Sequence, residues 1–171
     1  GFPLWVMDDA AWHLASIREK GLPVEEITAY NHLAIYLRWC MEHGLMGRDF
    51  LERYWDLAER WRRDPAHTDL RPFIRDALAG RLSYGLFGEE GEAFARYYYG
   101  HGDAPYFPSD IDDYSLRYFG PARYHSDEFQ DEAYLFVPFD EDYYRAMAQV
   151  IQGRWDCWQN QEVPEEAGPS E

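Results

Sequence analysis

Apolar side chains recur at helical spacing along most of this chain. In the segment 48–63, Phe50, Tyr54 and Ala58 follow one another at steps of four residues, with charged side chains between them. This is the period of an amphipathic helix. Similar patterns, most of them started by Asp or Thr and stopped by Gly or Pro, predict helices at about 9–20, 24–43, 48–63, 69–79, 89–99 and 141–159.

The predicted helix at 24–43 differs from the others because it is apolar nearly all round. Leu33, Ile35, Leu37 and Trp39 lie on different sides of it, which leaves little polar surface for solvent. A helix of this kind is normally buried at the centre of a domain. The fold is therefore predicted to be mainly α, a single-domain helical assembly of about six helices with Trp39 in its core.

Two stretches break the helical pattern. Residues 100–131 are rich in Gly, Pro, Asp and Tyr without a lasting period, which predicts a long loop of the kind that often carries function. Apolar and aromatic residues alternate from Ala133 to Phe139, which predicts a short strand and a small β element near the C-terminal half. We expect one globular domain over 1–160 and a mobile acidic tail over 161–171.

Composition narrows the class of protein. Hydrophobic residues make up 46% of the 171 positions and aromatic residues 18%, so wholesale disorder is excluded. A formal net charge of −16 disfavours nucleic-acid binding, and the absence of a long apolar run predicts no membrane span. The opening segment GFPLWV lacks the basic and apolar regions of a signal peptide, so the expected compartment is the cytoplasm.

The acidic charge is unevenly distributed. Residues 101–171 hold 16 acidic and 4 basic side chains, a net charge of −12, and many tyrosines lie in the same half. Carboxylates steer a cationic partner, and exposed tyrosines act as interface anchors. The candidate partner-binding residues are Tyr106, Asp110, Asp112, Asp113, Tyr114, Tyr118, Asp127, Glu128 and Asp131.

Catalytic and metal-binding motifs are incomplete. Cys40 and His43, with His13 from another helix, could share a metal ion, but no full ligand set is visible. Asp110, Asp112 and Asp113 fail the EF-hand pattern, although paired carboxylates could perform acid/base work. The prediction is no metal, no cofactor and no enzymatic activity, with a small metal-dependent or acid/base enzyme as the alternative.

The two cysteines do not make a disulfide framework. Cys40 and Cys157 each lie among apolar helical residues, so we expect two buried thiols that behave as small hydrophobic side chains. A single bridge between the second and the last helix stays open as an alternative.

Four segments together resemble a family of small bacterial proteins. They are DDAAWH at 8–13, HLAIYLRWCMEHGLM at 32–46, EEGEAFARYYY at 89–99 with DDY at 112–114, and YLFVPFDEDYYRAMAQVIQGRW at 134–155. Members of that family are typically encoded near polymorphic toxins and secretion-system effectors. The resemblance implies an immunity protein that binds and neutralises one cognate toxin. A regulatory binding module without a toxin partner is a further alternative.

Overall fold

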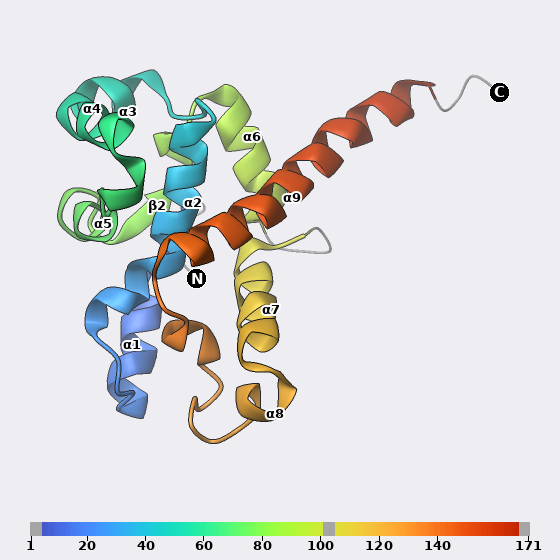
Figure 1. Ribbon diagram of the computed structural model, residues 1–171. Coiled ribbons are helices and arrows are strands. Elements are labelled where there is room, and N and C mark those ends of the chain that lie inside the picture. Colours follow the sequence, from blue (N-terminus) through green and yellow to red (C-terminus); the bar gives the residue numbers. More distant parts are fainter. Residues whose placement is uncertain (1–4, 101–104, 168–171) are drawn as a thin grey trace.

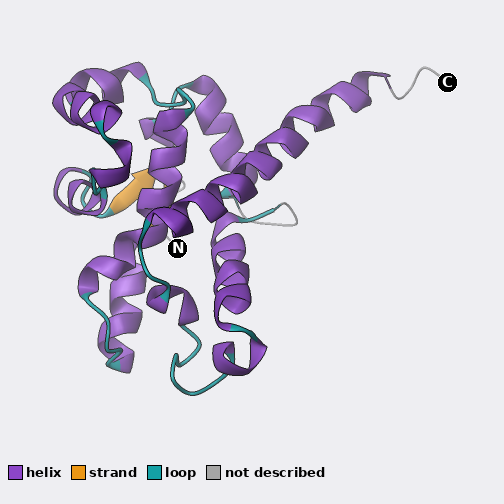
Figure 2. Cartoon of the chain, in the orientation of Figure 1, coloured by secondary structure: helices purple, strands orange, loops and turns teal. Residues whose placement is uncertain are grey.

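The structure is a computed structural model that describes residues 5–100 and 105–167, with side chains as far as residue 161 (Figure 1). Most of these residues are helical, and a two-stranded antiparallel sheet is the one sheet among them (Figure 2). The α-helices are α1 Ala10–Lys20, α2 Asn31–Glu42, α3 Arg48–Arg53, α4 Trp55–Arg63, α5 Arg71–Ala77, α6 Glu89–Tyr98, α7 Phe107–Phe119, α8 Pro121–Tyr124 and α9 Glu141–Ala167. The strands are β1 Val6–Asp9 and β2 Arg81–Ser83, and the short 3₁₀ helices are η1 Glu26–Tyr30, η2 Pro65–His67, η3 Tyr84–Leu86 and η4 Ala133–Phe136.

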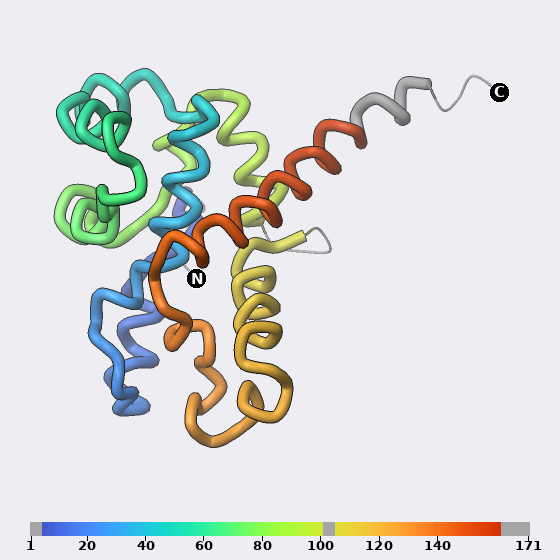
Figure 3. The backbone as a smooth tube through the Cα atoms, viewed as in Figure 1, coloured from blue at the N-terminus to red at the C-terminus, as the bar shows by residue number. Residues whose placement is uncertain are grey.

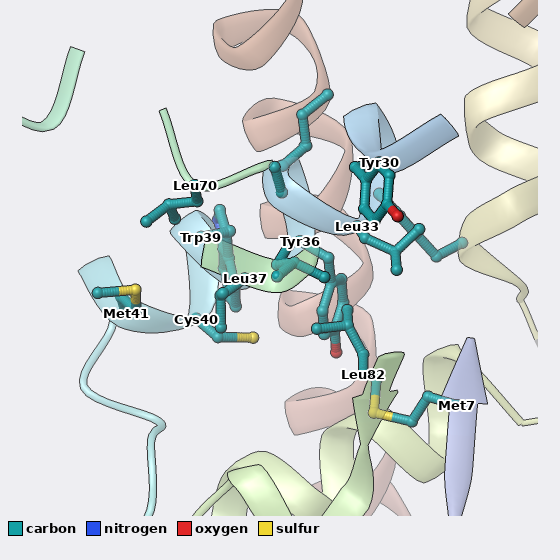
Figure 4. Close-up of a cluster of buried hydrophobic side chains, with 14 of the residues drawn as sticks. Met7, Tyr30, Leu33, Tyr36, Leu37, Trp39, Cys40, Met41, Leu70 and Leu82 are labelled. Carbon is teal, nitrogen blue, oxygen red and sulfur yellow. The ribbon is translucent and has the colours of Figure 1, made fainter. Parts of the chain in front are cut away.

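The mainly helical prediction is confirmed, and the central position of α2 with it. Trp39 in α2 is only 1% exposed, and Tyr36 and Leu37 beside it are fully buried. Figure 4 shows these side chains together with Leu70, which precedes α5, and Leu82 of β2. Helix α9 contacts α2, α6 and α7, and Figure 3 traces it across these elements. The core is thus built around α2, and α9 packs against α2, α6 and α7.

The described residues hold nine α-helices rather than about six, for two reasons. The predicted helix at 48–63 is interrupted at Tyr54, whose φ of −114° and ψ of 35° are not helical, and this separates α3 from α4. The predicted loop at 100–131 contains α7 and α8, with residues 101–104 outside the described part. Phe107, Ile111 and Ser115 are buried at steps of four in α7, so a helical stripe exists there behind a loop-like composition.

The small β element is not where the sequence predicted it. Strand β1 pairs with β2, with Val6 opposite Ser83 and Asp9 opposite Arg81. The strand predicted at 133–139 is not formed. Residues 133–136 are the 3₁₀ helix η4, and no strand among the described residues pairs with this segment. The alternation of side chains in that segment reflects burial and not a strand, because Leu135 and Val137 are buried in the core.

The last helix is longer than predicted. Helix α9 continues to Ala167, beyond the predicted helix end at 159, and residues 168–171 of the predicted tail lie outside the described part of the chain. Arg38 of α2 makes a two-pronged ion pair with Glu141 at the start of α9. Among the described residues, no helix is both long and apolar enough to cross a membrane.

Candidate functional site

A buried carboxylate at the end of β1 is the centre of the candidate site. Asp8 is 3% exposed and accepts hydrogen bonds on both of its oxygens. Oδ1 accepts from the backbone N–H of Asp9 at 2.9 Å and from His13 Nε2 at 3.1 Å. Oδ2 accepts from His32 Nε2 at 3.0 Å and from the Tyr99 hydroxyl at 2.9 Å. Every acceptor direction of this carboxylate is therefore used inside the protein.

Five elements of the fold supply these groups. Asp8 belongs to β1, and His13 follows it in α1. His32 lies in the first turn of α2, Tyr99 directly follows α6, and Tyr134 belongs to η4. The His13 Nδ1 atom lies 2.8 Å from the Tyr134 hydroxyl, so the chain of polar contacts runs from β1 to η4.

Local signals in the sequence hold β1 and α1 in this geometry. The side chain of Asp9 caps α1 by accepting from the N–H of Ala11, and Gly21 ends the helix in the left-handed conformation with a φ of 59°. Only a residue without a Cβ takes that conformation readily. The neighbouring Asp8 is thereby left to turn inward, towards His13 and His32.

The charge state of the cluster follows from its burial and contacts. Burial alone would raise the pKa of Asp8, but the charge of His32 and the hydrogen bonds from both imidazoles hold that pKa well below its ordinary value. Burial lowers the pKa of His32, and the nearby His13 lowers it further against the opposing effect of Asp8.

Two further features mark the cluster as more than a core hydrogen-bond network. The His32 Nδ1 atom is buried and has no hydrogen-bond partner among the described residues. A cavity of about 220 Å³ opens beside the two imidazole rings, which lie 4.5 Å apart edge to face. The cavity is lined by His13, His32, Pro108, Ile111, Asp112 and Tyr134. Buried polar atoms without partners are rare, so each needs an explanation.

The metal pair considered from the sequence is not assembled. Cys40 is fully buried, and burial raises the pKa of its thiol. His43 stacks on the Trp39 ring at 3.9 Å, and its Nδ1 lies 2.8 Å from the Trp39 carbonyl oxygen. The one residue of that prediction that joins other possible ligands is His13, which lies against His32 and Asp8 instead.

The structure corrects the prediction for the cysteines in part. Both are free, so the bridge left open from the sequence is not formed. Cys40 is buried as predicted, whereas Cys157 is exposed on α9, and a buried thiol is wrong for that position.

The nine candidate partner-binding residues do not share one environment. Asp110 is buried in α7, where Arg154 and the Tyr98 hydroxyl hydrogen-bond to it, so it is a structural ion pair and not an exposed contact. Three candidates are half-buried: Tyr106, Asp112 and Tyr114. Five are exposed: Asp113, Tyr118, Asp127, Glu128 and Asp131.

Sequence reasoning missed Asp8 and His32 as members of one site. Neither residue belongs to the ligand set considered from the sequence, which comprises Cys40, His43 and His13. A signal was present, because Asp8 and His13 both belong to the DDAAWH segment. Their meeting with His32 depends on how β1 and the first turn of α1 are placed against the start of α2.

The fold and the site define a small, mainly helical domain with a buried carboxylate between two histidines. A family model described as a domain of unknown function (DUF7832) matches residues 6–126, and the chain belongs to this family. The matched range includes Asp8, His13, His32 and Tyr99 but ends before Tyr134. No curated protein and no solved structure matches the chain.

Proposed function

We propose that this protein is an immunity protein, a stoichiometric inhibitor that binds a cognate bacterial toxin through an acidic surface. This acidic surface comprises the exposed residues Asp113, Tyr118, Asp127, Glu128 and Asp131, in α7 and in the segment between α8 and η4. The family resemblance suggests that the partner is a toxin, and the negative charge of this surface favours a partner with a basic surface.

Unpaired carboxylates are the observation that carries the proposal. Asp113, Asp127 and Asp131 make no side-chain hydrogen bond or ion pair with any described residue. Within the same surface Glu128 is paired with Arg123 by two hydrogen bonds, so Asp113, Asp127 and Asp131 carry its uncompensated charge. Uncompensated carboxylates at one end of a molecule attract a basic partner and raise its association rate.

Tyr118 offers the apolar anchor that charge alone cannot supply. Its side chain is 50% exposed on α7, and its ring lies 6.1 Å from that of Tyr114. Tyr114 in turn stacks at 5.3 Å on the buried Tyr143 of α9, which fixes the platform behind the exposed ring. Rigid tyrosines of this kind are enriched among interface residues that dominate binding energy.

Inhibition by this route needs no chemical step. Covering the active-site cleft or basic substrate-binding face of a toxin requires an interface of roughly 1,600 Å² with complementary charge. The helical scaffold holds α7 against α9, so little ordering entropy would be lost on binding.

The test begins with the product of the neighbouring gene. We expect it to co-purify with this protein and to lose toxicity when the two are co-expressed. The triple variant Asp113→Asn, Asp127→Asn, Asp131→Asn should slow association about tenfold at low salt and flatten its salt dependence. The matched control is Asp49→Asn, Glu52→Gln, Asp56→Asn, which removes the same charge from exposed positions on α3 and α4.

The anchor is tested by dissociation. Tyr118→Ala should raise the dissociation rate by about tenfold or more, because truncation of a hot-spot residue acts mainly on the dissociation rate constant. Trp55→Ala changes an aromatic residue on α4 that is 59% exposed, against 50% for Tyr118, and should leave the dissociation rate unchanged. If the two triple variants slow association equally, the acidic surface is not part of the interface. A neighbouring gene product that does not bind would overturn the immunity function itself.

A further inference from the structure

The Asp8 cluster brings together three donor atoms of the types that transition metals prefer. One carboxylate oxygen of Asp8 and one ring nitrogen each of His13 and His32 all lie within 4.8 Å of one another. The two contacts from Asp8 to the imidazole nitrogens are 3.1 and 3.0 Å. Ligands at about 2.0–2.1 Å in a tetrahedral zinc shell lie roughly 3.3 Å apart, close to these two contacts. The contacts use different oxygens of Asp8, Oδ1 towards His13 and Oδ2 towards His32, so the carboxylate would turn to present one oxygen to the ion.

From this arrangement we propose that Asp8, His13 and His32 form a binding site for one divalent transition-metal ion of the zinc class. The inference goes beyond the proposed toxin binding, because it uses different residues and does not depend on a partner. It also replaces the ligand set considered from the sequence, in which His13 would have joined Cys40 and His43.

An independent observation supports a ligand at this place. His32 is 2% exposed, and its Nδ1, the ring nitrogen other than the Nε2 that contacts Asp8, has no partner among the described residues. A buried imidazole that serves only the core usually has both nitrogens satisfied.

The surroundings of the three donors match the outer shell of a metal site. The Tyr134 hydroxyl lies 2.8 Å from Nδ1 of His13, where it would accept a hydrogen bond from that nitrogen once Nε2 coordinates a metal. The Tyr99 hydroxyl donates to Asp8 and orients its carboxylate. Such partners fix ring orientation and strengthen coordination.

Three protein ligands leave a fourth position, and the structure has room for it. The cavity of about 220 Å³ is lined by both imidazole side chains together with Pro108, Ile111, Asp112 and Tyr134. A water molecule or a small exogenous ligand would complete the shell there, as in zinc sites with three protein ligands.

The donor set also predicts which metals bind. Two imidazole nitrogens and one carboxylate suit Zn²⁺ and Co²⁺, whereas Mg²⁺ prefers an all-oxygen shell and keeps its waters. The experiment therefore titrates Zn²⁺, and separately Mg²⁺, into untagged, chelator-treated full-length chain by calorimetry. Cys157→Ser serves as the background, because an exposed thiol binds zinc by itself.

The expected result is one Zn²⁺ per chain and no measurable Mg²⁺ binding. His13→Gln and His32→Gln should each weaken Zn²⁺ binding at least 100-fold. His125→Gln, which changes an exposed histidine away from the cluster, should stay within threefold of the background protein. Bound Co²⁺ should show the strong visible absorption of a tetrahedral site, and the two cluster variants should lose it.

Folding is controlled in the same series. Because His32 is buried, its variant is compared with the background protein by circular dichroism without metal. Should it fail to fold, the half-buried His13→Gln and the outer-shell variant Tyr134→Phe carry the test, with Tyr134→Phe expected to weaken binding about 10–100-fold. No Zn²⁺ binding by the background protein, or binding that survives His13→Gln unchanged, would overturn the proposal.

Discussion

Arg154 in α9 and Asp110 in α7 form a two-pronged ion pair, with Nε donating to Oδ2 at 2.9 Å and Nη2 to Oδ1 at 2.8 Å. The Tyr98 hydroxyl donates to the same Oδ2 at 2.5 Å. The side chain of Asp110 is 7% exposed, and among the described residues Arg154 and Tyr98 are the side-chain partners that compensate for its lost hydration. The pair therefore ties the last helix to the helix that carries part of the acidic surface.

Loss of this pair should destabilise the fold. Arg154→Ala leaves a buried carboxylate without its cation, and we expect the free energy of unfolding to fall by about 1–3 kcal/mol. Urea denaturation measures the change. Arg145→Ala on the same helix is the control. The Arg145 side chain is 73% exposed, and its Nε lies as far as 4.0 Å from Glu141 Oε2, so this ion pair is weak. Equal losses in both variants would contradict a structural role for the pair.

Trp39 should be among the most costly residues to truncate. It is 1% exposed and contacts the Phe94 and Trp155 rings, so Trp39→Ala removes a large buried surface and leaves a cavity. The expected loss is about 3–5 kcal/mol in chemical denaturation. Trp55→Ala, at 59% exposure, should cost less than about 1 kcal/mol. A loss below 1 kcal/mol at Trp39 would be inconsistent with a central α2.

Stability should fall at alkaline pH, in part through Tyr124. A hydrogen bond to Asp112 at 2.5 Å, together with partial burial, raises the pKa of Tyr124 to about 12. A pKa above the unfolded value of about 10 stabilises the fold below pH 10, and this contribution is lost as the pH rises from 10 to 12. Tyr124→Phe lacks the contribution throughout, so its midpoint temperature should approach that of the wild type over this range. A gap that stays constant from pH 9 to 11 would refute the assignment.

The two cysteines should react very differently with a thiol reagent. Cys157 is exposed on α9, so one thiol per chain should be modified rapidly under native conditions. Cys40 is fully buried and burial raises its thiol pKa, so it should react only after unfolding. Cys157→Ser should abolish the fast phase and keep the slow one. Two fast-reacting thiols in the native protein would contradict the buried position of Cys40.

Local signals explain how much of the helical framework could be predicted. The ends of α1 follow from Asp9 and Gly21, whose capping roles depend on neighbouring residues alone. The burial of α2 follows from an apolar surface on every side, which excludes an exposed position whatever its partners are. The break at Tyr54 and the short strand β2 have no comparable local signal. The sequence therefore predicts a single helix over 48–63 where the structure has two, and it predicts the β element at the wrong segment.

By itself, the sequence determined the helical class, the central helix and the acidic excess of the C-terminal half, because periodicity, caps and net charge are properties of neighbouring residues and of composition. Only the tertiary structure decided which carboxylates are exposed and which are buried in ion pairs. It buried Asp110 against Arg154 and left Asp113 exposed three residues further on. It also brought Asp8 to His32, 24 residues away, and His13 to Tyr134, 121 residues away. Such contacts depend on how whole elements pack, and no local spacing in the chain records that packing.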